Sequence, residues 1–279
     1  MARVVRKQVR LLPCDSERLF PGQLLNGEVI SAYLRLLERR NAMDHNLPNV
    51  LALDSYFFTV LKRSGHERAR GHHRDQDLWD YEKILVPVHE ELADVGHWWL
   101  LVVELRKETI SAYDSLKGRN HKPAMDLLRE YLKKEEMRAK TEARSWCLYG
   151  ERSCPSQDNL VDCGVFLCAI AGAICGGREA KELRVDGREF RRQMAKELRE
   201  DSVTENKSSQ PELFPGEEPD WSFEDLAKEL DQLTDPTKWS LILPAEDETP
   251  EEIGVLQEEV DAIKPTGRCR GNVLGTHGS

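Results

Sequence analysis

Hydrophobic positions dominate one segment of this 279-residue chain, residues 163–177, "CGVFLCAIAGAICGG". The segment is apolar on nearly every side of a helix, which is typical of a helix buried in a core. Asp162 stands directly before it as a candidate N-cap, and Gly176 indicates where the helix ends. Because the run is too short to cross a bilayer, we expect a central helix of a soluble domain.

Apolar residues at helical spacing predict further helices that cover a core with one face. Asn26 and Asp54 are candidate N-caps for two of them, and Pro123 falls near the first turn of another, where its missing N–H costs little. The predicted amphipathic helices cover residues 27–40, 55–65, 121–137 and, as a closing surface helix, 187–201.

Runs rich in β-branched and aromatic residues predict strands at residues 83–90, 97–105 and 109–115. The last two runs are separated only by residues 106–108, which is the pattern of an antiparallel hairpin. The order of predicted helices and strands contains no internal repeat. We therefore predict one α+β domain with a central mixed sheet flanked by helices.

The predicted hairpin brings a histidine and a carboxylate together. If Leu105 pairs with Thr109, the residue opposite Asp114 is about two positions from His97. Both side chains then lie at the open end of the hairpin, where a carboxylate can fix the histidine tautomer and stabilise its imidazolium form. A partly exposed histidine at a strand start and an ordinary turn aspartate fit the same pattern.

Cys163 occupies the first turn of the apolar helix, where free N–H groups and the helix dipole favour a thiolate. A neighbouring imidazolium would favour the thiolate further and give a nucleophile for carbonyl carbon. Gln157 lies six residues earlier, and its amide could bind an oxyanion together with the Cys163 backbone N–H.

The other cysteines carry no comparable signal. Seven cysteines without a regular framework indicate reduced thiols, and the lack of a CxxC pair argues against zinc. Cys168 and Cys175 are expected to be inert core residues, and Cys147 and Cys154 are placed in the preceding loop without partners. No metal or cofactor is expected. The N-terminus has no apolar signal segment, so we expect an intracellular protein of the nucleus or cytoplasm.

Charge divides the chain unevenly. Residues 201–279 hold 19 acidic and 6 basic side chains, a net charge of −13, whereas residues 1–200 carry about +3. A capping-box pattern predicts a short helix at 222–233 within the acidic part. The predicted parts are an N-terminal extension at 1–19, a domain at 20–201, and an acidic Pro/Glu-rich, mostly disordered tail at 202–279.

Two segments, "GHWWLLVVELRKETISAYDSLKG" and "PSQDNLVDCGVFLC", resemble the ubiquitin-like-protein protease family, the sentrin-specific cysteine proteases that process and remove SUMO and related modifiers. That family has a His-Trp pair opening a strand, an Asp in a Y-x-D-S-L context, and a Gln six residues before the Cys of D-C-G. These features fall on His97 with Trp98, on Asp114, and on Gln157 with Cys163. Two upstream segments, "LLNGEVISAYLRLL" and "LDSYFFTVL", are also similar, so the resemblance covers about residues 20–200.

The resemblance implies a papain-like α+β fold and a mechanism. Cys163 would attack the carbonyl of a C-terminal Gly-Gly bond, and His97 would shuttle the proton. Asp114 would orient His97, and Gln157 would line the oxyanion hole.

The resemblance also implies a narrow substrate tunnel that admits residues without side chains. The family's Trp after the His packs over the diglycine, and Trp98 stands in that place. The family usually has a second Trp, in W-L-N-D, as another wall of the tunnel. Here Leu24 replaces that Trp and Gly27 replaces the Asp, so this wall offers less apolar area.

These observations favour a cysteine protease or isopeptidase that acts on SUMO or a related modifier, as a monomer without nucleic-acid or membrane partners. A clan-related acetyltransferase and a non-catalytic modifier-binding module are the alternatives, and Asp114 in its "AYDSL" context favours the protease, because such acetyltransferases usually carry Glu. Leu241 and Ile253 begin β-prone runs before acidic residues, which resemble SUMO-interacting motifs.

Overall fold

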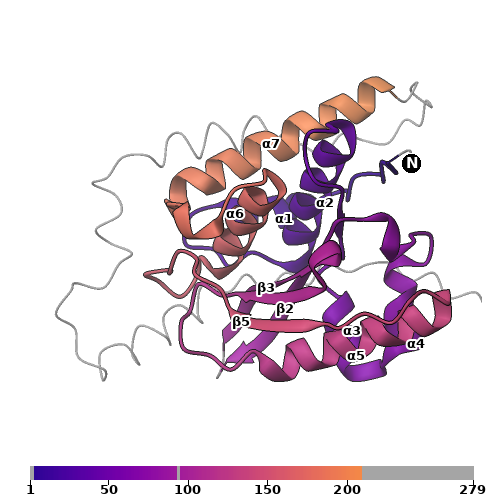
Figure 1. Cartoon of the computed structure of the whole chain (residues 1–279). Coiled ribbons are helices and arrows are strands. Elements are labelled where there is room, and N and C mark those ends of the chain that lie inside the picture. Colours follow the sequence, from indigo (N-terminus) through magenta and orange to yellow (C-terminus); the bar gives the residue numbers. More distant parts are fainter. Residues whose placement is uncertain (1–2, 93–94, 209–279) are drawn as a thin grey trace, which may run out of the picture. The chain divides into compact units, whose positions relative to one another are not determined.

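A five-stranded sheet forms the centre of the computed structural model, which describes residues 3–92 and 95–208 (Figure 1). The strand order is β1-β2-β3-β4-β5, with the two outer pairs parallel and the two inner pairs antiparallel. The strands are β1 Val50–Ala52, β2 Lys83–Leu92, β3 Val95–Glu104, β4 Thr109–Tyr113 and β5 Cys147–Glu151. The predicted α+β domain with a mixed sheet is confirmed.

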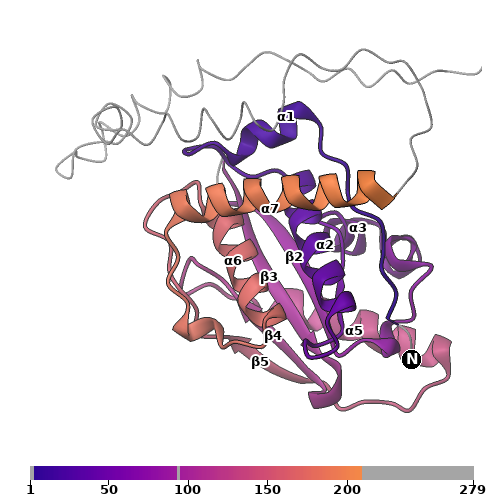
Figure 2. The ribbon, with the colours of Figure 1, turned by 90° about the horizontal axis from the view of Figure 1, so that it is seen from above.

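Helices cover both faces of this sheet (Figures 1 and 2). One buried apolar cluster lies between the sheet and α2, α6 and α7, and a second lies between the sheet and α3, α4 and α5. The helices are α1 Pro13–Ser16, α2 Gly27–Met43, α3 Phe57–Ser64, α4 His66–Arg70, α5 Lys122–Ala139, α6 Cys163–Cys175 and α7 Gly187–Ser208. Because both faces are covered, the central strands are apolar on both sides.

The alternation of side chains along β3 shows how the two layers are filled. Trp98 and Leu100 belong to the cluster under α2 and α6, whereas Trp99 and Leu101 belong to the cluster on the opposite face. His97 directly precedes Trp98, so the alternation places it on the same side of β3 as Trp99 and Leu101. The start of β3 therefore presents a histidine to one face and a tryptophan to the other.

Of two helix starts predicted from N-cap residues, one is confirmed and the other was wrong. The side chain of Asn26 accepts a hydrogen bond from the backbone N–H of Val29 at 3.1 Å, so its role as the N-cap of α2 is confirmed. Asp54 accepts from the N–H groups of Tyr56 and Phe57, but α3 begins only at Phe57. The predicted start at residue 55 was wrong because Asp54 stabilises a turn that precedes the helix.

The hairpin between β3 and β4 closes one residue earlier than predicted. Its partners are Glu104 and Thr109, and the connection is a 3₁₀ turn, Leu105–Lys107, followed by Glu108 at φ 52°. The left-handed Glu108 reverses the chain after the 3₁₀ turn, so Leu105 joins the loop and the proposed Leu105–Thr109 pairing was wrong.

The short outer strands β1 and β5 were not predicted. Cys147 is the first residue of β5 rather than part of a loop, and exposed and half-buried residues alternate along this edge strand. The sequence "CLYGE" carries little apolar signal because only part of its surface is covered. β1 is buried but has only three residues, Val50–Ala52, too few to show a period.

The last described helix, α7, continues to Ser208 and so passes the predicted end of this helix at residue 201. In the described ranges, no helix combines the length and the apolar character that a bilayer crossing requires. The helix expected at 222–233 and the motifs expected at Leu241 and Ile253 lie outside the described residues.

Candidate active site

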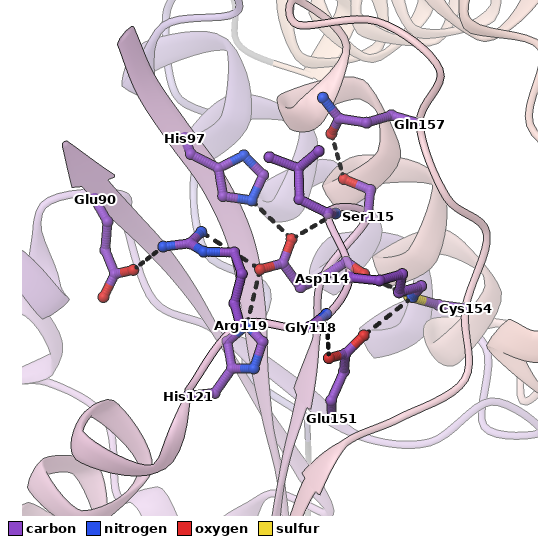
Figure 3. A network of polar contacts seen from close by, with 12 residues as sticks. Glu90, His97, Asp114, Ser115, Gly118, Arg119, His121, Glu151, Cys154 and Gln157 are labelled. Atoms are coloured by element: carbon purple, nitrogen blue, oxygen red, sulfur yellow. Dashed lines mark hydrogen bonds and ion pairs between the residues drawn. The ribbon is translucent and has the colours of Figure 1, made fainter. Parts of the chain in front are cut away.

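His97 and Asp114 meet at the open end of the hairpin (Figure 3). His97 lies near the start of β3, and Asp114 directly follows Tyr113, the last residue of β4. Nε2 of His97 is 2.7 Å from Oδ1 of Asp114, and the two residues are 3% and 0% exposed. The hairpin thus places the two side chains together, as its sequence pattern predicted.

The carboxylate of Asp114 is held by several donors. Oδ1 accepts from His97 and from the backbone N–H of Leu116, and Oδ2 accepts from Nε2 of His121 at 2.8 Å, with Nη1 of Arg119 at 3.5 Å (Figure 3). Burial alone would raise the pKa of Asp114, but the hydrogen bonds from His121 and His97 and the charge of His97 outweigh it and hold that pKa well below its usual range. The carboxylate is therefore ionised at neutral pH.

The His97 imidazole lies between Asp114 and the thiol of Cys163. Burial lowers the pKa of His97, but hydrogen bonds to Asp114 and Cys163 and their charges outweigh this effect and raise the pKa to about 9. Nε2 faces Asp114, so Nδ1 is the ring nitrogen that remains for the thiol. This arrangement places a protonated imidazole beside the thiol of Cys163 at neutral pH.

The start of α6 leaves donors beside the thiol. Cys163 is the first residue of α6 and is 1% exposed. The first helical N–H to be bonded is that of Phe166, which donates to the carbonyl of Asp162 at 2.9 Å. Within residues 3–92 and 95–208, no acceptor is bonded to the backbone N–H of Cys163 or Gly164. These groups and the helix dipole can stabilise negative charge.

Asp162 occupies the N-cap position of α6, but its side chain does not cap the helix. Oδ1 of Asp162 instead accepts two hydrogen bonds from the guanidinium of Arg191, at 2.6 and 3.0 Å. The predicted capping role was therefore wrong. A charge-assisted bond to a buried arginine is stronger than a bond to a neutral backbone N–H, and no local pattern indicates that Arg191 is near.

Gln157 is fixed on the loop before α6 and beside the loop after β4. Its Oε1 accepts from the hydroxyl of Ser115 at 2.5 Å, and its backbone N–H donates to the Ser115 carbonyl (Figure 3). Its Nε2 donates to the carbonyl of Asn159 at 2.6 Å, which uses one of its two amide hydrogens. The structure thus ties Gln157 to the residue that follows Asp114.

Trp98 and Leu25 meet near the start of α6, and Leu24 directly precedes Leu25 in the chain. The indole N–H of Trp98 donates to the carbonyl of Leu25 at 3.1 Å, and the ring lies 4.4 Å from that of His89 between centroids. Leu25 packs closely on Gly164, since a Cβ added to Gly164 would lie 3.0 Å from the Cβ of Leu25. Trp98 is 8% exposed and Leu24 is 37% exposed, so Leu24 is the more accessible of these two side chains.

Sequence reasoning missed the groups behind Asp114. His121 is 4% exposed, and its ring lies 4.6 Å from Trp99 while Nε2 bonds Asp114. Nη2 of Arg119 reaches Oε2 of Glu90 at 2.7 Å. The only signal was a run of potential donors after Asp114, "KGRNH", which resembles an ordinary polar turn.

The other buried thiols of the described residues divide into two kinds. Cys168 and Cys175 are buried in α6 as predicted, and burial raises both of their pKa values, that of Cys175 to about 12. Cys154 is not a partnerless loop residue, because its Sγ lies 3.2 Å from the Asp114 carbonyl and 3.0 Å from Nζ of Lys117. Across the described ranges, no three His, Cys, Asp or Glu side chains are grouped to hold a metal ion.

Comparison with known proteins identifies the family of this arrangement. The sequence model of the Ulp1 protease family, C-terminal catalytic domain, matches residues 23–205. The chain belongs to this family. The family resemblance predicted from the sequence is thus confirmed, and the acetyltransferase and binding-module alternatives are not favoured.

Curated relatives include Sentrin-specific protease 2 of Rattus norvegicus, which is 31% identical over 175 residues, 60% of this chain and 28% of that protein. Ubiquitin-like-specific protease 1 of Saccharomyces cerevisiae is 26% identical over 166 residues, 58% of this chain and 25% of that protein. The matched regions therefore span less than a third of these relatives.

Solved structures of the family share the fold. The C-terminal Ulp1 protease domain in complex with Smt3, the yeast ortholog of SUMO, aligns with a TM-score of 0.60 at 25% identity and covers 71% of this chain and 86% of that one. The Ulp1-like SUMO protease catalytic domain of Chaetomium thermophilum aligns with a TM-score of 0.56 at 22% identity and covers 77% and 83% of the two chains.

Proposed function

We propose that this protein is a cysteine protease that cleaves after the C-terminal Gly-Gly of SUMO or a related ubiquitin-like modifier, from precursors or from conjugates. The observation that carries the proposal is the buried Asp114–His97 pair in contact with Cys163 at the start of α6. A thiol, an imidazole and an orienting carboxylate in this order of contact are the groups that acyl transfer to sulfur requires.

The reaction begins with attack of the Cys163 thiolate on the carbonyl carbon of the last glycine. The oxygen becomes negatively charged, and free N–H groups at the start of α6 and the Gln157 amide stabilise it. Collapse of this intermediate breaks the C–N bond, and the His97 imidazolium gives its proton to the leaving amine. A thioester between the modifier and Cys163 remains.

Hydrolysis of the thioester uses the same groups in reverse. Neutral His97 takes a proton from a water molecule, whose oxygen attacks the thioester carbonyl. Asp114 stabilises the imidazolium that forms, because its carboxylate stays ionised and keeps Nε2 of His97 occupied. The modifier leaves with a free carboxylate, and the thiolate–imidazolium pair is restored.

The choice of modifier follows from the relatives and the surface beside the thiol. The relatives named above are sentrin-specific and ubiquitin-like-specific proteases, and the Ulp1 domain was solved with Smt3. Trp98 and Leu24 form the apolar wall over the diglycine, with Leu24 giving a smaller wall than a tryptophan would. A slot with such walls selects residues that lack side chains.

The same proposal assigns roles to the rest of the chain. Residues 20–201 act as the catalytic domain, working as a monomer inside the cell. The acidic region 202–279 contributes modifier-binding motifs that begin at Leu241 and Ile253. Truncation near residue 205 would then weaken binding of the modifier while leaving the chemistry of Cys163 intact.

Probes that carry a C-terminal electrophile test the proposal. The full chain is incubated with SUMO, ubiquitin and neddylation-modifier probes, and covalent adducts are followed by gel shift. We expect an adduct with SUMO, its loss in Cys163→Ala, and its retention in Cys168→Ala, which removes a buried thiol from the same helix. No adduct with any probe would refute the proposed function.

A further inference from the structure

Arg191 is a buried arginine that joins two parts of the candidate active site. It lies on α7, is 1% exposed, and gives two hydrogen bonds to Oδ1 of Asp162, at 2.6 and 3.0 Å. Three other bonds go to backbone carbonyls of the segment that leads to Leu24, those of Arg18 at 3.0 Å, Phe20 at 3.1 Å and Gln23 at 2.7 Å, and a further bond goes to the carbonyl of Val161 at 3.4 Å. A fully buried guanidinium with this many acceptors fixes both the residue before Cys163 and the segment before Leu24.

The carboxylate of Asp162 is held away from α6 on every side. Oδ1 is occupied by Arg191, and Oδ2 accepts from Nδ2 of Asn159 at 2.9 Å. Gly187, at the start of α7, leaves room for the Asp162 carboxylate, since a Cβ added to Gly187 would lie 2.4 Å from Oδ2 of Asp162. The side chain therefore makes no cap bond although Asp162 is the N-cap residue.

An aspartate at an N-cap normally turns toward its helix and accepts from the first free N–H groups. At the start of α6, those donors stand beside Cys163. A capping carboxylate would place a negative charge next to the thiolate and occupy the N–H groups that an oxyanion needs. Stabilising this helix start in the usual way would thus oppose the proposed chemistry.

We propose that Arg191 is a positioning residue that keeps the Asp162 carboxylate off the N-terminus of α6, so that its dipole and N–H groups serve Cys163. The inference rests on the proposed role of Cys163 as nucleophile. Arg191 neutralises the carboxylate and anchors it to α7, and the same guanidinium holds the segment before Leu24.

The contacts of Asp162 extend this effect to the second oxyanion donor. Asn159 donates to Oδ2 of Asp162, and its carbonyl accepts from Nε2 of Gln157 at 2.6 Å. Arg191 is therefore connected through Asp162 and Asn159 to Gln157. Release of Asp162 would disturb the placement of both groups assigned to the oxyanion, the Gln157 amide and the N–H groups at the start of α6.

Alkylation of Cys163 by iodoacetamide tests the inference without a modifier substrate. Rates for the Cys163 peptide are read by mass spectrometry in the full chain at neutral pH, with melting curves to establish folding. In Arg191→Met, we expect alkylation about tenfold slower, because a freed carboxylate turns toward the thiolate. Arg192→Met is the matched control, since the adjacent Arg192 is partly exposed and its ion pair among the described residues is with Glu189.

A second variant separates this electrostatic role from a structural one. In Arg191→Met/Asp162→Ala, the carboxylate is gone, and we expect the alkylation rate to return to within about threefold of wild type. A structural role alone predicts a rate no faster than in Arg191→Met, because the double variant loses more hydrogen bonds. That result, or wild-type alkylation in folded Arg191→Met, would overturn the inference.

A conservative variant decides the case if Arg191→Met does not fold. Arg191→Lys keeps a positive charge beside Asp162 but cannot bond all the loop carbonyls. We expect its alkylation rate within about threefold of wild type, while KM for a SUMO substrate with a fluorogenic C-terminal amide rises. A tenfold slower alkylation in folded Arg191→Lys would overturn the inference. Failure of the wild type to cleave SUMO would instead count against the proposed function.

Discussion

Replacement of Asp114 by Asn removes the charge that sets the proton affinity of His97. The side-chain oxygen of Asn can still accept from His97 and from the N–H of Leu116, and the substitution leaves the buried volume unchanged. The new amide group would face the donors His121 and Arg119, which lose their acceptor. We expect a folded protein in which His97 is no longer favoured as an imidazolium.

The size of the effect follows from the pKa of His97. At a pKa of about 9, roughly nine-tenths of His97 is protonated at pH 8, whereas at the ordinary value of 6.5 the fraction is about three-hundredths. The supply of imidazolium at pH 8 therefore falls by up to ~30-fold. In the wild type the imidazolium is lost only as the pH rises through about 9, and in the variant this loss begins nearer 6.5.

Two measurements check this prediction. The His97 ring is titrated by NMR in the resting enzyme, and hydrolysis of SUMO with a fluorogenic C-terminal amide is followed between about pH 6 and 10. Asp126→Asn, the same change at a partly exposed residue of α5, serves as the control. An unchanged NMR midpoint, or hydrolysis at pH 8 within about threefold of wild type, would refute the assigned role of Asp114.

Further predictions address other contacts of the site. His121→Phe keeps a ring in place but removes the donor to Asp114, so kcat should fall about tenfold with KM unchanged, and an unchanged kcat would show that this donor is dispensable. Leu24→Ala should raise KM about tenfold with little change in melting temperature, because the side chain is 37% exposed; a large loss of stability with unchanged KM would point to packing instead. Gly164→Ala should destabilise the fold by about 1–2 kcal/mol in chemical denaturation, because its Cβ would meet a leucine Cβ at 3.0 Å. Gly172→Ala in the same helix meets only an atom at 4.0 Å and should stabilise by up to about 1 kcal/mol; equal effects of the two changes would contradict the packing described for α6.

The sequence was informative where one kind of residue dominates a long enough segment. The continuous apolar run located α6 within one residue, and the runs of β-branched and aromatic residues located β2 and the β3–β4 hairpin, which carries His97 and Asp114. The outer strands β1 and β5 were missed, because one is too short for a period and the other is only partly covered. Local periodicity cannot report how far an edge strand is buried.

The contacts that decide the site chemistry were the part that sequence reasoning could not supply. Asp162 was expected to cap α6 because it precedes a helix, and only the fold brings Arg191 to it from 29 residues away. The same holds for His121, whose approach to Asp114 depends on the turn before α5 and on Trp99 beside it. Such choices between a local acceptor and a distant charged partner depend on tertiary structure.

Mapping of the residue that reacts with a modifier probe decides whether Cys163 is the nucleophile. The full chain is treated with SUMO that carries a vinyl sulfone in place of its C-terminal carboxylate, and the modified peptide is identified by mass spectrometry. We predict a single adduct on Cys163, although Cys147 is more exposed. An adduct on Cys147 instead, or no adduct while the chain is folded, would contradict it.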